Sequence, residues 1–265
     1  TKSFSGVMLA AAIEDKIVSS FDEKVSDTIT EWKSDEQKSR ITLRQLLSLS
    51  SGIDAGKSGL TVPSYIEAIN SPMKFEPGTH FQYGPVPYQT FGEFMTRKLK
   101  PRNETVMSYL KRRILDPIGL RVSGWQMQNG EPLIPQGASL TAREWVKFGL
   151  FLKNGGKWNG KQIVRKDLLD DLIISSKANP AYGITFWLNH PGKDPRGIEI
   201  GGGSEVGQGG FTDGVTDLYM AAGAANQRLY IIPSLDMVIV RQGRMAKWDD
   251  HEFLGRLLSG RFSSK

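Results

Sequence analysis

The sequence contains no cysteine and only three histidines in 265 residues. The absence of cysteine excludes disulfide bonds, thiolate metal ligands and a cysteine nucleophile, and it is compatible with an oxidising compartment. The histidines, His80, His190 and His251, are too far apart to form an HExxH or Cys/His zinc motif. We therefore expect neither a metal site nor a cofactor.

Long hydrophobic runs are also missing. No stretch approaches the roughly 18 consecutive apolar residues of a membrane-spanning helix, and the first residues do not follow the signal-peptide pattern. The composition, 39% hydrophobic and 23% charged, is that of a globular protein. We expect a periplasmic or secreted protein with no membrane span.

Two further features lack the pattern of a nucleotide or nucleic-acid site. The net charge of +6 is dispersed in clusters such as 97–102 and 111–113, without interleaved aromatic residues, so we expect no nucleic-acid partner. The run GGGSEVGQGG at 201–210 matches neither GxGxxG nor the phosphate-loop pattern, and we expect a mobile loop there. The absence of GxSxG argues against an α/β-hydrolase nucleophile elbow.

The first two thirds of the chain have the periodicity of helices. Helices are predicted over 4–13, 63–70, 88–99, 105–115, 141–153 and 166–175. Apolar residues from Phe21 to Trp32 also recur at about helical spacing. Thr42 is predicted to cap a short helix with an apolar face of leucines, and Gly52 to stop it.

After Tyr182 the pattern changes to short β-branched and aromatic runs separated by turn residues, followed by an amphipathic helix. The runs are GITFWL, DLYMAAG, RLYIIP and DMVIVRQG, and the helix is DDHEFLGRLLSG. The predicted fold class is α+β, with an antiparallel sheet flanked by helices and a mostly helical lobe. We expect one domain over 1–265, with the helical lobe at 1–180 and the sheet and last helix at 181–265.

Several segments stand in a characteristic order along nearly the whole chain. They are ITLRQLLSLSSGI, FEPGTHFQYG, YLKRRILDPIGL, ASLTAREWVKFGLFLKNGGKWNGKQIV and RLYIIPSLDMVIV. In this order they resemble the signature segments of the serine β-lactamase and DD-peptidase superfamily, in the class C-like branch that also holds esterases. The resemblance implies that fold, and we expect the family's N-terminal strands to be missing from this sequence.

The resemblance also implies an SxxK motif at the start of a buried helix, and Lys2 in TKSF matches its lysine. The nucleophilic serine is then expected two residues before Thr1, outside the sequence. Residues three apart share one face of a helix, so the ammonium can reach the hydroxyl. Because a desolvated lysine can lose its proton near neutral pH, we expect Lys2 to accept the serine proton. The other SxxK matches, at 71–74 and 108–111, are expected to be incidental.

Tyr83 in FQYGP matches the tyrosine of the family's YxN triplet. By this match it would shuttle the proton from the nucleophile to the leaving group, with the nearby cation favouring its phenolate. Pro85 stands where the family has asparagine, so the amide that would contact a substrate is absent.

The family's KTG triplet matches Ala221, Ala222 and Gly223. Its cationic first position is therefore an alanine, unless Arg228 or Arg241 replaces the charge from a neighbouring strand. A backbone donor does not depend on the side chain, so the N–H of the next residue, Ala224, would still form half of an oxyanion hole.

The function implied is a serine hydrolase that forms an acyl-enzyme on an ester, amide or β-lactam carbonyl of a small molecule. Because Ala221 carries no charge, we expect an esterase or amidase rather than a penicillinase. Two alternatives remain open: a non-catalytic binding protein that retains the fold, and an N-terminal-nucleophile hydrolase that uses Thr1 with its own amine as base. The sequence does not predict the oligomeric state.

Overall fold

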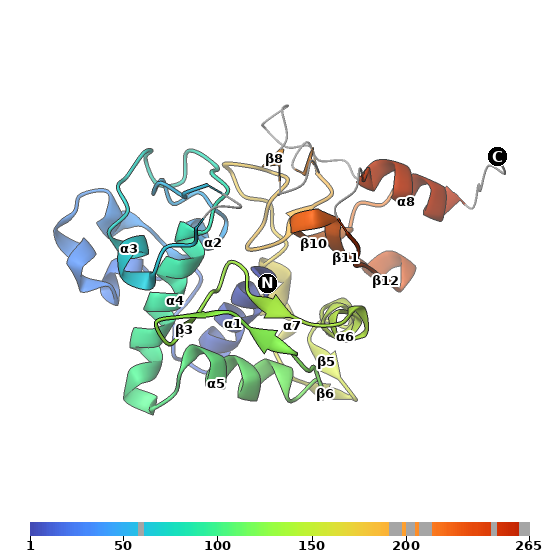
Figure 1. Cartoon of the computed structure of the whole chain (residues 1–265), viewed down its shortest axis with the longest axis horizontal. Coiled ribbons are helices and arrows are strands. Elements are labelled where there is room, and N and C mark those ends of the chain that lie inside the picture. The colour runs from blue at the N-terminus through green and yellow to red at the C-terminus, as the bar shows by residue number, and fades with distance from the viewer. Residues whose placement is uncertain (58–60, 191–197, 200–204, 207–213, 245–247, 260–265) are drawn as a thin grey trace.

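The computed structural model describes residues 1–57, 61–190, 198–199, 205–206, 214–244 and 248–259 (Figure 1). The α-helices are α1 (Ser3–Glu14), α2 (Leu43–Leu47), α3 (Tyr65–Ile69), α4 (Val86–Leu99), α5 (Val106–Leu110), α6 (Ala142–Lys153), α7 (Lys166–Asp171) and α8 (Asp250–Ser259). Short 3-10 turns are η1 (Val25–Asp27), η2 (Thr30–Ser34), η3 (Lys38–Arg40), η4 (Lys100–Arg102), η6 (Ala224–Asn226) and η7 (Pro233–Leu235), and a π-helical turn, η5 (Lys111–Leu115), continues α5. Within these residues, no helix has both the length and the apolar character needed to cross a membrane.

The main sheet is antiparallel with strand order β12-β11-β10-β7. Its strands are β7 (Trp187–Leu188), β10 (Tyr219–Gly223), β11 (Gln227–Ile232) and β12 (Met237–Arg241). Short two-stranded pairs occur elsewhere: β1 (Gly124–Trp125) with β4 (Ala138–Ser139), β2 (Met127–Gln128) with β3 (Glu131–Pro132), β5 (Lys157–Trp158) with β6 (Lys161–Gln162), and β8 (Ile198–Glu199) with β9 (Glu205–Val206). The predicted α+β class is confirmed.

Alternate residues of β11 face the helices on the two sides of this sheet. On one side α6 packs closely, because a Cβ at Gly149 would lie 2.8 Å from Leu229 and 2.5 Å from Val238 of β12. On the other side Tyr230 stacks on Phe253 of α8 with ring centroids 5.8 Å apart. Successive side chains of β11 thus point to opposite faces of the sheet, and both faces are covered by helices. The face on which a side chain lies decides whether it can reach the cavity described below.

Helix α1 is apolar on all sides and lies in the middle of the molecule (Figure 1). A glycine lets it approach the next layer, since a Cβ at Gly6 would lie 2.5 Å from the Thr185 hydroxyl oxygen. One hydrophobic cluster runs from Phe4 in this helix to Leu254 in α8. The packing fixes the position of the first residues of the chain against the end of the main sheet.

Some helix boundaries differ from the prediction. Thr42 caps α2 through a capping box with Gln45, but the helix ends at Leu47, well before Gly52. The cause is local, because Leu49 adopts a left-handed backbone with φ 60°. Helix α3 begins after a Ser64 cap rather than at Pro63, and α7 ends at Asp171 instead of extending to residue 175.

One other expectation needs correction, one set of strands was not expected, and one expectation falls mostly outside the described residues. The stretch from Phe21 to Trp32 forms the short turn η1 and the start of η2 instead of one helix. The strand pairs within 124–162 were not predicted. The glycine-rich run 201–210, expected to be a mobile loop, lies outside the described residues except for β9.

Candidate active site

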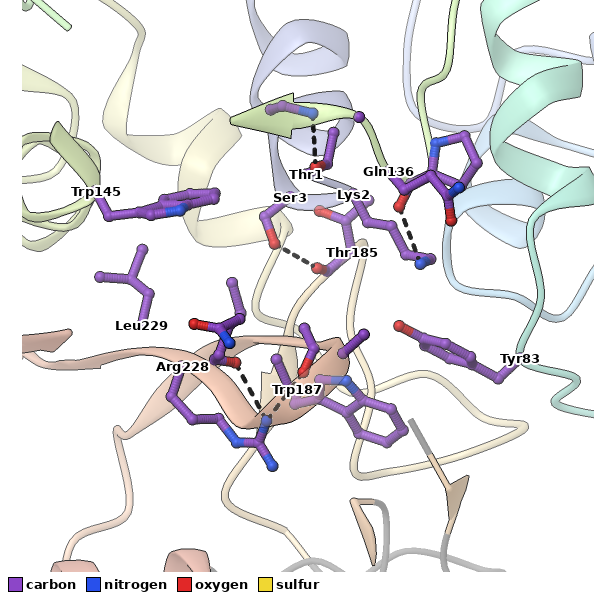
Figure 2. A pocket seen from close by; sticks show the side chains of 18 of the residues that line it. Thr1, Lys2, Ser3, Tyr83, Gln136, Trp145, Thr185, Trp187, Arg228 and Leu229 are labelled. Atoms are coloured by element: carbon purple, nitrogen blue, oxygen red, sulfur yellow. Dashed lines mark hydrogen bonds between the residues drawn. The ribbon is translucent and has the colours of Figure 1, made fainter. Parts of the chain in front are cut away.

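A cavity of about 330 Å³ opens at the N-terminal end of α1. Its walls come from the start of α1, from loops before α4 and around β4, and from β10 and β11 (Figure 2). The sequence-predicted site residues that line it are Thr1, Lys2, Tyr83, Pro85, Ala221, Ala222, Gly223 and Ala224. Positions that are far apart in the sequence thus meet in one cavity.

Lys2 lies at the base of this cavity. Its Nζ donates a hydrogen bond to the Pro135 carbonyl oxygen at 3.1 Å and lies 5.0 Å from the centre of the Tyr83 ring. No aspartate or glutamate is among the described residues that line the cavity. Desolvation lowers the pKa of the Lys2 ammonium from 10.5 to about 8. A neutral amine, able to accept a proton, is therefore accessible near neutral pH.

Tyr83 is enclosed by other aromatic rings. It stacks on Trp187 with centroids 5.7 Å apart and meets Tyr182 edge-on at 6.4 Å. Burial raises the pKa of the Tyr83 hydroxyl, and this effect outweighs the opposing influence of the Arg228 charge. The Tyr83 hydroxyl is therefore protonated at rest, whereas we had expected a nearby cation to favour the phenolate.

The aromatic wall itself was missed by sequence reasoning. Tyr182 hydrogen-bonds through its hydroxyl to the Tyr88 hydroxyl at 2.7 Å and packs against Trp187 at 4.8 Å. Trp145 of α6 lines the opposite part of the cavity (Figure 2). The run GITFWL indicated a strand, but its pattern did not indicate which aromatic residues would face a cavity.

The hydroxyls next to Lys2 hold the start of α1 in place. The Thr1 hydroxyl oxygen accepts a hydrogen bond from the Ala138 N–H at 3.3 Å, and the Ser3 hydroxyl donates to the Thr185 carbonyl at 3.0 Å. These contacts connect α1 to β4 and to the segment before β7. They fix the depth at which Lys2 enters the cavity.

The end of β10 supplies the backbone side of the site. Gly223 is extended, with φ −119° and ψ 165°, and pairs with Gln227 across the turn η6. Ala224 follows at the rim of the cavity, while the short side chain of Ala221 brings no charge to it. The segment can therefore present a backbone N–H without a cationic side chain.

Arg228 and Arg241 both line the cavity, but their guanidinium groups are held by other side chains. The Arg228 side chain is completely buried and pairs with Asp250 at 2.9 Å. Arg241 lies opposite Arg228 in the register and stacks its guanidinium on Trp248, 4.1 Å from the ring centre. Both guanidinium groups are thus held on the α8 side of the sheet. Over the part of the chain that the structure describes, no cluster of three His, Cys, Asp or Glu side chains could hold a metal ion.

Comparisons with known proteins identify the family and the fold of this chain. The family model described as Beta-lactamase matches residues 1–228. A class C beta lactamase from Rhodobacter sphaeroides has a similar structure, with 15% identity, a TM-score of 0.69, and coverage of 98% of this chain and 83% of that one. A family VIII carboxylesterase has 13% identity and a TM-score of 0.70, and the match covers 94% of this chain and 77% of that one. A penicillin binding protein from Bacillus halodurans has 16% identity and a TM-score of 0.62, and the match covers 97% of this chain and 83% of that one.

No curated protein matches this chain. The structural similarities, at these low identities, establish the fold. The family model extends over most of the sequence, including every candidate site residue from Lys2 to Ala224. The chain belongs to the β-lactamase family.

Proposed function

We propose that the protein is a serine hydrolase that works through an acyl-enzyme on ester or amide carbonyls, with its nucleophile three residues before Lys2. One observation carries the proposal: the Lys2 amine, with a pKa lowered to about 8, lies in the same cavity as Tyr83 and the Ala224 backbone. A base, a hydroxyl relay and a backbone donor are the groups that acyl transfer requires.

The reaction has two halves. The serine oxygen bonds to the carbonyl carbon while its proton moves to Lys2 Nζ, and the Ala224 N–H donates to the oxygen that becomes negative. The bond to the leaving group then breaks, and the leaving group takes the proton by way of Lys2 and the neutral Tyr83 hydroxyl. Water attacks the acyl ester in the same manner, which releases the acid and regenerates the serine.

The walls of the cavity favour an apolar ester or amide over a penicillin. Tyr83, Tyr182 and Trp187 present aromatic surface, and Ala221 provides no fixed cation for a carboxylate. Arg228 is committed to Asp250 and does not compensate.

The test is turnover of a short-chain nitrophenyl ester by the full-length protein, compared with acylation by a β-lactam followed by mass spectrometry. We expect ester turnover and slow β-lactam labelling. Lys2→Met should abolish turnover, whereas Lys111→Met should not, because Lys111 belongs to an exposed SxxK match on α5 and η5. Rapid stoichiometric β-lactam labelling without ester turnover would reverse the ranking.

A non-catalytic binding protein is the second candidate, favoured by Pro85 at the position of the family asparagine. In that case ester hydrolysis would stay at background in the unmodified protein, and Lys2→Met would change ligand affinity alone. The other alternative is an N-terminal-nucleophile hydrolase that uses Thr1. Peptide mapping after reaction with the ester would then find the acyl group on Thr1.

A further inference from the structure

Behind the hairpin of β10 and β11 lies a polar group of four side chains, which we call the Asp250 cluster: the buried Arg228, Tyr230 and Asp250 and the half-buried Trp248. Arg228 donates to Asp250 through Nε at 2.9 Å and through Nη2 at 3.1 Å. The Tyr230 hydroxyl also donates to Asp250, and the Trp248 indole N–H lies 3.2 Å from both. With exposed fractions of 0% and 6%, the Arg228 and Asp250 side chains form an ion pair shielded from solvent.

The remaining nitrogen of Arg228 reaches the end of the candidate oxyanion strand. Its Nη1 donates to the Gly223 carbonyl at 3.3 Å and to the Gln227 carbonyl at 3.1 Å. Gly223 and Gln227 are paired residues on the two sides of the turn that follows β10. In Figure 2 the guanidinium lies on the opposite side of the strand from Lys2. The arginine therefore holds the hairpin from the side away from the base.

The bond to Gly223 also sets the direction of the next N–H. The peptide between Gly223 and Ala224 is planar and trans, so its C=O and N–H point in opposite directions. When the carbonyl is held towards Arg228, the Ala224 N–H is turned away from the Arg228 guanidinium, and Ala224 itself lines the cavity. Glycine has the greatest backbone freedom, so this peptide plane would rotate easily without a tether.

We propose that Arg228 is a positioning residue that aims the Ala224 N–H at the developing oxyanion, and that Asp250 holds the guanidinium in place for this task. The proposal rests on the acyl-transfer function proposed above. An arginine suits the position because its planar fork can bind a carboxylate with two nitrogens and leave a third for a carbonyl. A lysine at residue 228 could not make both sets of contacts.

The decisive experiment separates the positioning of the Ala224 N–H by Arg228 from the mere neutralisation of the buried Asp250 charge. Arg228→Met alone leaves Asp250 buried and unpaired, which destabilises the fold. The double variant Arg228→Met/Asp250→Asn removes both charges and keeps an acceptor oxygen for Tyr230 and Trp248. We expect its melting temperature to recover to near that of the unmodified protein, while kcat for the ester falls about 10- to 100-fold with little change in KM, somewhat less than the loss of an entire oxyanion donor.

Two controls define the outcome. Arg113 pairs with Glu14 and Asp15 outside the cavity, so Arg113→Met should lower the melting temperature and leave kcat unchanged. A boronic acid with the same acyl group forms a tetrahedral adduct that occupies the oxyanion position. Its affinity for the double variant should fall by the same factor as kcat, while the affinity for the free product acid stays unchanged.

The failure of this inference can be told apart from the failure of the proposed function. If the unmodified protein hydrolyses the ester and the double variant matches it in kcat and boronic-acid affinity, Arg228 has only a structural role and the inference is overturned. If the unmodified protein neither turns over the ester nor binds the boronic acid, both proposals are overturned together.

Discussion

At the scale of single residues, the low pKa of Lys2 depends on which groups surround its ammonium. No carboxylate among the described lining residues neutralises its ammonium, which has the Pro135 carbonyl and the Tyr83 ring as neighbours. Desolvation thus acts without opposition and lowers the pKa of Lys2 to about 8. Without a carboxylate partner among these residues, the charged form of Lys2 is less favourable, and the neutral amine is available as a base.

The pH dependence of the rate follows from this shift. Acylation needs the neutral amine, so kcat/KM for the ester should rise with pH up to about 8 and level off above it. Between about pH 8 and 10.5 Lys2 is protonated in the unfolded chain and neutral in the folded one, so the contribution of Lys2 to stability rises with pH across this window. The buried tyrosines with raised pKa values, such as Tyr83 and Tyr182, oppose this contribution as the pH approaches 10. A pH–rate profile checks the first statement. A profile that stays flat over this range would contradict it, and Lys111→Met should leave the inflection where it is.

Lys2 and Tyr83 should behave as one unit. If both serve the same proton transfer, Lys2→Ala and Tyr83→Phe should each lower kcat far more than they alter KM, and the double variant should be little worse than the poorer single variant. Steady-state kinetics of the three variants on the ester measure this. Effects that simply add in log rate would mean that Tyr83 works somewhere other than beside Lys2.

Thr185 carries strain next to the site. It is a β-branched residue with φ 68°, and its buried hydroxyl oxygen is without a hydrogen-bond partner within the described structure. Such a left-handed conformation costs a residue with a Cβ roughly 1–2 kcal/mol and glycine much less. Thr185→Gly should therefore be more stable than Thr185→Ala by about 1 kcal/mol, as measured by chemical denaturation. Equal stability of the two variants would show that the backbone there is unstrained.

At the scale of elements, α2 depends on its cap. The Thr42 hydroxyl accepts from the Gln45 N–H at 3.2 Å, and the Gln45 side chain accepts from the Thr42 N–H at 3.1 Å. Thr42→Ala should lower the free energy of unfolding by about 1 kcal/mol, while Thr42→Ser should nearly preserve it. Denaturation midpoints measure both. An alanine variant as stable as the serine variant would mean that packing alone holds this short helix.

The elements also explain what the sequence could and could not predict. Thr42 was recognisable because a cap and its partner lie three residues apart, and the strands near Tyr219 and Tyr230 were recognisable from their β-branched and aromatic residues. The end of α2 was not, because a left-handed leucine such as Leu49 has no sequence signature. The pair of Arg228 and Asp250 was also hidden, since the two residues lie 22 positions apart and meet only after α8 packs on the sheet.

At the scale of the whole molecule, the site depends on the central position of α1. Its apolar surface is buried on all sides, so the rest of the fold surrounds it and brings Tyr83 and Ala224 to the end where Lys2 lies. The resemblance to a family predicted this meeting of residues. It did not predict the raised pKa of Tyr83, because the enclosing rings of Tyr182 and Trp187 come from a segment whose role was visible only in three dimensions.

The most direct test of the central claim is to find the residue that carries the acyl group. The full-length protein is mixed with a nitrophenyl ester, quenched in acid during turnover, and examined by intact-mass measurement and peptide mapping. We predict one acyl group per molecule, attached to a serine three residues before Lys2, and no adduct in Lys2→Met. An acyl group on Thr1 or on any other residue, or ester turnover with no covalent adduct, would contradict the proposed mechanism.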